Sequence, residues 1–172
     1  LMEPEALVRA ESFARAQNPS FDRLARRRVR SSPGTTYPNT EVVWQLRAEG
    51  SGAWLPTVIT MTVSLRTGLV INYGRSDRPY AGPTEPLITE ADAQARVVAV
   101  AQQDPRYTDL TIAETTLWVA APGEMNNTNA EFRLLWTITL ANPPQGVLGE
   151  RIILSWYVDA LTGEVIPAGG RG

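Results

Sequence analysis

The sequence predicts an α+β protein made of two tandem repeats, each with one helix packed on a four-stranded antiparallel meander sheet. Each half opens with a helical pattern that stops at an X-Pro pair, Asn18-Pro19 and then Asp104-Pro105. The residue before proline is pushed out of the α region, so both helices should end there. Each half closes on a strand, a turn and a strand around a glycine, Gly68 and then Gly163.

The two closing segments, Met61–Ile71 and Trp156–Ile166, correspond residue by residue. Gly163 follows Gly68 by 95 positions, and Asp159 follows Ser64 by the same 95. A glycine at this point of a hairpin takes the left-handed conformation at little steric cost. Both segments therefore predict a tight hairpin, and Gly68, Asp159 and Gly163 are interpreted as structural hairpin residues.

Residues 1–75 form the predicted first repeat, which is the more divergent of the two. Its expected elements are a helix over Met2–Gln17 and strands over Phe21–Ser31, Glu41–Glu49, Leu55–Leu65 and Leu69–Tyr73. Alternation along the strands predicts a core face with Trp44, Ile59, Met61 and Val63 beneath the helix.

The second half is expected to fold in the same way after a proline-rich linker at residues 76–87. The predicted second repeat covers residues 88–168, and residues 169–172 form a tail. Its expected elements are a helix over Thr89–Gln103 and strands over Leu110–Ala120, Glu131–Leu140, Glu150–Asp159 and Glu164–Pro167. Thr89 is a good N-cap, and the expected core face carries Trp136, Leu154, Trp156 and Val158.

Composition excludes several classes of chemistry. The 172 residues contain no His, no Cys and no Lys, so a His-based triad, a thiol nucleophile, an ordinary zinc site and a Schiff base are excluded. We expect no cofactor and no metal. The net charge of −2 argues against nucleic acid as a partner. No apolar run approaches the ~20 residues that cross a bilayer, so this segment should not insert into a membrane.

The second half resembles the PepSY domain family. An alanine-rich helix follows Ile88-Thr89-Glu90, and the family's closing pattern is matched within Trp156–Ile166 at Tyr157, Val158, Asp159, Ala160, Thr162, Gly163, Glu164 and Val165. The first half looks like a degraded copy, with Ser64 where the family has Asp and Leu69 where it has Glu. A tandem pair of such units is also similar in architecture to beta-lactamase inhibitory protein.

The resemblance implies a non-catalytic, extracytoplasmic bacterial module that inhibits or regulates a peptidase or binds a cell-envelope protein. It carries over no catalytic residue, and it implies that Asp159 and Gly163 are fold determinants. The chain opens at Leu1 inside a helical pattern, so we expect it to be a piece of a longer, anchored protein that is secreted, periplasmic or on the cell surface.

An arginine-rich strand is the first candidate binding surface. Strict alternation places Arg26, Arg28 and Arg30 on one face with Leu24, and Arg23 and Arg27 on the other face with Ala25 and Val29. The arginines would suit an acidic partner. The competing interpretation is an edge strand that charge protects against edge-to-edge pairing, and the sequence favours it.

Tryptophans and carboxylates are the remaining candidates. Trp54, beside a glycine-rich turn, and Trp118, near a loop, are candidate partner-binding residues, whereas the other tryptophans fit the core. Asp104, Asp109 and Glu124 could serve glycosidase chemistry or calcium binding, although their spacing matches no calcium loop. The leading hypothesis is thus a protein-binding module. The alternatives are a structural spacer or dimerisation unit and, less favoured, a carboxylate-based wall hydrolase.

Overall fold

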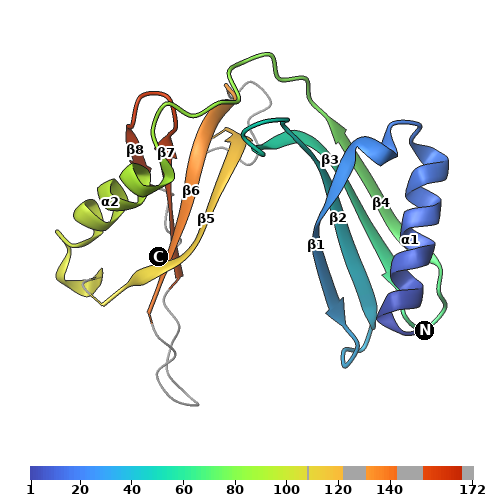
Figure 1. Ribbon diagram of the computed structural model, residues 1–172. Helices are drawn as coiled ribbons and strands as arrows, with labels where there is room; N and C mark the ends of the chain where they lie inside the picture. Colours follow the sequence, from blue (N-terminus) through green and yellow to red (C-terminus); the bar gives the residue numbers. More distant parts are fainter. Residues whose placement is uncertain (108, 122–130, 143–152, 168–172) are drawn as a thin grey trace. The chain divides into compact units, whose positions relative to one another are not determined.

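The computed structural model describes residues 1–107, 109–121, 131–142 and 153–167 (Figure 1). Its helices are α1 (Glu3–Gln17) and α2 (Glu90–Ala101), with short 3-10 turns η1 (Phe21–Arg23) and η2 (Pro105–Tyr107). Its strands are β1 (Leu24–Ser32), β2 (Asn39–Arg47), β3 (Trp54–Ser64), β4 (Val70–Asp77), β5 (Thr111–Ala120), β6 (Arg133–Ala141), β7 (Ile153–Asp159) and β8 (Val165–Pro167).

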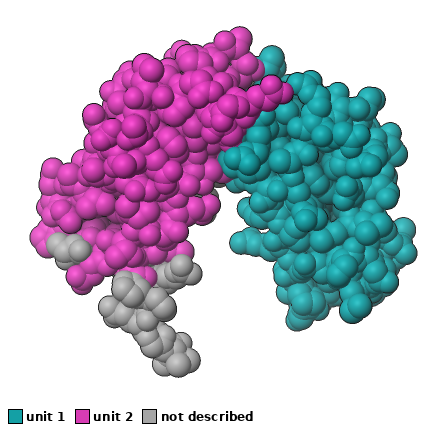
Figure 2. Space-filling model, viewed as in Figure 1, with its two compact units in different colours: residues 1–47, 54–79 teal, residues 48–53, 80–172 magenta. Residues whose placement is uncertain are grey.

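The chain divides into two compact units, shown in two colours in Figure 2. Unit 1 holds residues 1–47 and 54–79, and unit 2 holds residues 48–53 and 80–172. In unit 1, β1 pairs antiparallel with β2, β2 with β3, and β3 with β4. In unit 2, β5 pairs antiparallel with β6, β6 with β7, and β7 with β8.

Helix α1 covers one face of the unit 1 strands because it presents a stripe of small residues. Ala6, Ala10 and Ala14 are completely buried, which lets the helix backbone lie close to the sheet. The predicted core face is confirmed: Trp44, Ile59, Met61 and Val63 all pack in this core. Phe21, on η1, meets Trp44 edge to face with 5.2 Å between ring centroids.

Helix α2 begins as the sequence predicts, since the Thr89 hydroxyl accepts a hydrogen bond from the Asp92 N–H over 3.1 Å. Its buried residues Ala93, Val97 and Ala101 pack on Ile138, Leu140 and Val158, with Trp136 and Trp156 at the margin of this core. The segment before the helix is tied to the β7–β8 hairpin, because the N–H groups of Leu87 and Ile88 both donate to the Ala160 carbonyl over 2.9 Å.

The predicted fold class, two repeats each with a helix on a separate four-stranded sheet, is wrong, because the eight strands belong to one eight-stranded sheet. Alternating polar and apolar residues identify a strand, but they do not show whether its edge ends the sheet. Strand β3 begins at Trp54, whereas β4 pairs only with Thr57 to Val63. The first residues of β3 therefore extend past β4, and such an end leaves backbone groups open for a sheet to continue.

Two element boundaries also differ from the prediction. Residues Phe21–Arg23 form a 3-10 turn instead of the start of the first strand, because Phe21 turns inward to pack on Trp44. Strand β4 continues past Tyr73 to Asp77, into the stretch predicted as linker. Antiparallel pairing with β3 decides this, since Thr57 lies opposite Asp77 and Thr60 lies opposite Gly74.

Candidate protein-binding surface

The arginines of β1 do not alternate as predicted, because the strand carries a β-bulge. Arg26 lies opposite Trp44 and Arg28 lies opposite Val43, so Arg27 is the extra residue between them. A bulge shifts the side-chain alternation by one position. Arg26 therefore shares the helix-covered face with Trp44, whereas Arg28 lies on the face away from α1.

The same bulge gathers three arginines on the face of the unit 1 strands that α1 leaves uncovered. Arg27 donates to the Gln45 side-chain oxygen over 2.9 Å, Arg28 forms an ion pair with Glu41, and Arg30 also lies opposite Glu41. The prediction that Arg26, Arg28 and Arg30 share a face is thus wrong for Arg26. It holds for the other two, and Arg27 joins them.

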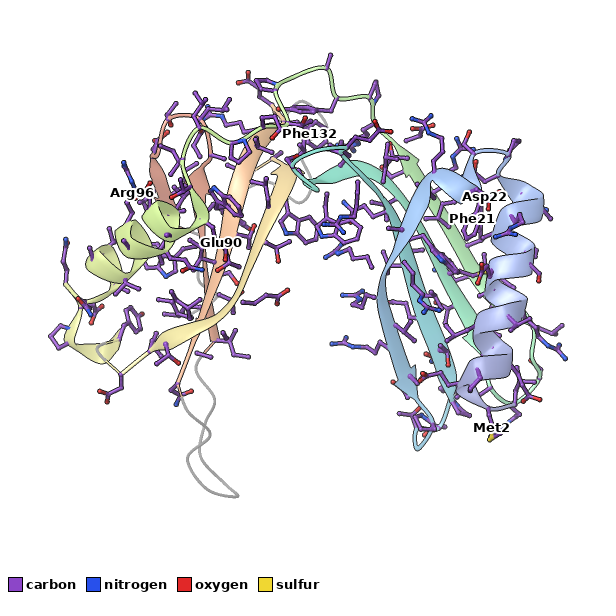
Figure 3. The ribbon with its side chains drawn as sticks, viewed as in Figure 1. Met2, Phe21, Asp22, Glu90, Arg96 and Phe132 are labelled. Atoms are coloured by element: carbon purple, nitrogen blue, oxygen red, sulfur yellow. The ribbon has the colours of Figure 1, made fainter. Side chains whose placement is uncertain are left out.

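Arg26 instead lines a shallow depression on the α1 side, with a volume of about 370 Å³. Arg15 contacts three other residues that line this depression. Its guanidinium lies over the Phe21 ring at 5.6 Å from the centroid, and it pairs with Asp22 at 3.1 Å and with Glu11 at 3.3 Å. Phe21 and Asp22 lie together beside the end of α1 in Figure 3. The acids here are already paired with Arg15, so the depression offers a mixed surface with no single charge for a ligand.

The two candidate tryptophans are half-buried and lie in different units. Trp54 lies opposite Arg47, whose guanidinium is 4.9 Å from the indole centroid. Trp118 lies opposite Leu135, on the face of the unit 2 strands that α2 does not cover. The cation–π contact holds the Trp54 ring against its neighbouring strand, which gives the ring a local structural role.

The predicted hairpin residues lie where a turn needs them. Gly68 and Gly163 have φ values of +71° and +78°, and each donates its N–H to the residue four positions earlier over 2.8 Å. The Asp159 carboxylate is buried and accepts the N–H groups of Leu161 and Thr162, both over 2.9 Å. In the first hairpin the Ser64 hydroxyl provides only a longer bond of 3.3 Å from the Thr67 N–H.

The candidate carboxylates are not brought together as a site. Asp109 is exposed, Asp104 is half-buried, and Glu124 lies outside the described residues. Among the residues that the structure describes, no group of three or more Asp or Glu could hold a metal ion.

A shallow depression of about 560 Å³ in unit 2 contains Tyr80, Arg133 and Asp159. Burial raises the pKa of the Tyr80 phenol above its usual value, and the nearby Asp159 carboxylate raises it further. The Tyr80 hydroxyl donates to the Pro83 carbonyl over 3.0 Å, and Arg133 lies 3.8 Å from the Asp159 carboxylate. The Tyr80–Pro83 bond thus closes the segment at residues 80–83 on itself, and Asp159 pairs with Arg133 in the same depression.

One open, largely apolar surface of unit 1 was missed by the sequence interpretation. It is a groove of about 360 Å³ at the end of unit 1, which we call the tip groove, lined by Thr36, Tyr37, Pro38, Ser64, Arg66, Thr67, Leu69 and Ile71. Three of its large side chains are open to solvent: Tyr37 is 80% exposed, Leu69 63% and Ile71 60%. The run of apolar residues from Leu69 to Ile71 directly after Gly68, with a tyrosine in the β1–β2 loop, was the available signal.

The walls of the tip groove are fixed by hydrogen bonds. The Leu65 N–H donates to the Pro38 carbonyl over 2.9 Å, which joins the β1–β2 loop to the β3–β4 hairpin. The Asn39 side-chain amide donates to the Tyr37 carbonyl, also over 2.9 Å. The groove is therefore largely preformed, which lowers the entropic cost of filling it.

Comparison of the sequence with family models and with curated proteins finds no match. The resemblance to PepSY domains therefore stays a prediction. Among the described residues, no helix is both long enough and apolar enough to span a bilayer.

Proposed function

We propose that the chain is a non-catalytic protein-binding module that acts outside the cytoplasm on a peptidase or a cell-envelope protein. The tip groove carries the binding part of this proposal. The resemblance of Trp156–Ile166 to the PepSY closing pattern supports the location and the class of partner.

The tip groove supports binding because its apolar side chains gain free energy when a partner covers them. Full burial of a Leu or Ile side chain is worth about 1.5–3 kcal/mol, and Tyr37 adds an aromatic ring with a polar end. Contiguous exposed apolar side chains mark interaction sites, whereas scattered ones do not. Tyr37 lies in the β1–β2 loop, Leu69 in the β3–β4 turn and Ile71 on β4, and all three line one groove.

The mechanism would be surface occlusion. The module covers part of its partner's surface, and no covalent bond is made or broken. Arg66, on the wall of the groove, forms no ion pair among the described residues and would meet a carboxylate of the partner. The apolar groove provides affinity and the arginine selects the orientation.

A photo-crosslinking experiment tests the proposal. A benzoyl-phenylalanine replaces Leu69 in the groove, and in a control protein it replaces Val8, an apolar residue of α1 that is 66% exposed. Each protein is irradiated with the envelope fraction of the source organism. We expect a discrete adduct from position 69 and none from position 8. The partner, identified by mass spectrometry and purified, should bind a Leu69→Thr variant at least tenfold more weakly.

Two outcomes would contradict the proposal. Equal adducts from positions 69 and 8 would show that the groove is not a preferred surface. Absence of any discrete adduct from position 69, in all fractions of the source organism, would remove the groove as a partner-binding site.

A further inference from the structure

Strand β4 is an edge strand, since among the described strands it pairs with β3 alone. Its second residue, Ile71, lines the tip groove, and the strand then runs beside β3 (Figure 1). An edge strand presents a row of N–H and C=O groups that another strand can pair with. The question is which groups of β4 are open and whether anything protects them.

The register of the β3–β4 ladder identifies the open groups. The Ser64 N–H donates to the Leu69 carbonyl over 2.9 Å, which makes this the first hydrogen-bonded pair of the hairpin. Hydrogen-bonded and non-hydrogen-bonded positions alternate along β3, and the count is made along β3 because a register shift makes Ile71 an extra residue on β4, between Val70 and Asn72. Tyr73, opposite Met61, and Arg75, opposite Ile59, fall in the non-bonded class. Their N–H and C=O groups therefore point to the outer edge.

The protection on β4 is limited to an irregularity at Ile71 and to the charges of Arg75 and Asp77 near its far end. The first five residues, Val70 to Gly74, carry no charge and no proline, and three of them are Val, Ile and Tyr, which favour extended backbone. Strand β1 differs sharply, because arginines crowd it from Arg26 to Arg30. Charged side chains on an edge strand disfavour pairing with another strand, so β1 is better protected than the first half of β4.

We propose that β4 receives an extended segment of the partner protein as an additional strand. Its apolar side chains would fill the tip groove beside Leu69 and Ile71, and an acidic side chain would pair with Arg66. Backbone hydrogen bonds to Tyr73 and Arg75 would supply the register, and the groove would supply the specificity. This inference rests on the proposed function and names the chemistry of the segment that is bound.

Charge favours a foreign segment over a second copy of this chain. The acidic residue of β4 is Asp77, and both of its oxygens are engaged, one by Arg75 at 2.9 Å and the other by the Thr57 hydroxyl at 3.2 Å. A second copy adding its own β4 would thus bring no free carboxylate to Arg66. A segment with alternating apolar residues and one acidic residue complements the edge better.

The test uses a phage-displayed library of random 12-residue peptides selected on the full chain. Two variants at position 75 separate the contribution of the backbone N–H to peptide binding from that of the side chain. Arg75→Pro removes the outward N–H without breaking a bond to β3, whereas Arg75→Ala removes the guanidinium and keeps the N–H. Thermal melting and circular dichroism confirm that both variants fold. A third variant, Asn72→Ala, is a control for loss of a β4 side chain with the backbone intact, and N-methylated peptides test the backbone pairing if Arg75→Pro does not fold.

We expect enriched peptides with apolar residues at every second position and an Asp or Glu near one end. They should bind Arg75→Ala and Asn72→Ala within about threefold of the parent chain, and Arg75→Pro and Leu69→Thr at least tenfold more weakly. Arg66→Ala should weaken acidic peptides and spare versions with Gln in place of the acid. N-methyl groups on one of the two alternating sets of peptide backbone nitrogens should abolish binding, and those on the other set should not, because only one set faces β4. This result does not depend on any variant of the chain.

Peptides that need Leu69 but tolerate N-methylation of either set and Arg75→Pro would overturn strand addition and leave the groove function standing. Peptides that ignore Leu69, or no enrichment at all, would overturn both. A concentration-dependent dimer in sedimentation that Arg75→Pro abolishes would show that a second copy occupies β4, against the proposal.

Discussion

The guanidinium of Arg96, on α2, donates a hydrogen bond to the carbonyl oxygen of Gly163 over 3.0 Å. The same relationship occurs in unit 1, where Arg9 on α1 donates to the Gly68 carbonyl over 3.2 Å. In both units a helix arginine thus closes over the glycine of a hairpin. The positive φ is the main reason why each position favours glycine, and a Cβ would also force the flexible end of the arginine to shift.

Gly163→Ala should lower the free energy of unfolding by about 1–2 kcal/mol, the usual cost of a left-handed residue with a Cβ. A Cβ would also lie 2.7 Å from the Arg96 guanidinium. Urea denaturation measures the change. Gly34→Ala is the matched control, because nothing lies within 4 Å of its Cβ position and its φ is not positive. Equal losses for the two variants would contradict the steric argument.

Arg96→Ala should cost about 1 kcal/mol, because one side-chain hydrogen bond to a carbonyl is lost. The double variant with Gly163→Ala should cost less than the sum of the two single changes, since removing the guanidinium relieves the contact with the new Cβ. A double-mutant cycle from urea denaturation gives the coupling. Strict additivity would show that the guanidinium does not crowd this glycine.

Asp159→Ala should destabilise the protein more than Ser64→Ala, although the two residues occupy matching turns. Asp159 accepts two backbone N–H groups at 2.9 Å and is buried, so its loss leaves both donors unpaired and should cost about 2–3 kcal/mol. Ser64 accepts one longer bond, worth about 0.5–1 kcal/mol. Thermal unfolding of both variants checks the order, and the reverse order would contradict it.

Tyr80 should make the protein less stable at high pH. Its pKa in the folded chain is raised above the model-compound value of 10.0, first by burial and then by Asp159. The neutral phenol is therefore favoured in the folded state, so its contribution is complete below pH 10 and is lost as pH rises through the folded pKa. Unfolding free energies between pH 8 and 12 should fall less steeply in Tyr80→Phe. Identical slopes in both proteins would reject this assignment.

We expect the arginines on β1 to prevent aggregation of the protein through that edge of the sheet. The double variant Arg28→Thr/Arg30→Thr removes two charges from the strand, and Arg23→Thr/Arg66→Thr removes two charges elsewhere. We expect light scattering to detect aggregation at lower protein concentration for the first pair, because an uncharged edge invites pairing between molecules. If binding to an acidic partner is the role of these arginines, the first variant should lose that partner and remain soluble.

The sequence alone was enough to predict both helices, the presence of the strands and both glycine turns, although several element bounds differ by a few residues. Asn18-Pro19 and Gly163 act on their own backbone, and the apolar faces of β2 and β3 follow from a period of two. Such features depend on a few neighbouring residues, so a sequence can show them without knowledge of the fold.

Only the tertiary structure decided that eight strands belong to one sheet, that a bulge at Arg27 turns Arg26 away from Arg28, and that Tyr37 and Leu69 share a groove. Each depends on which strand lies beside which and in what register. These choices are settled by pairing between segments distant in sequence, where a shift of one residue exchanges the two faces of a strand.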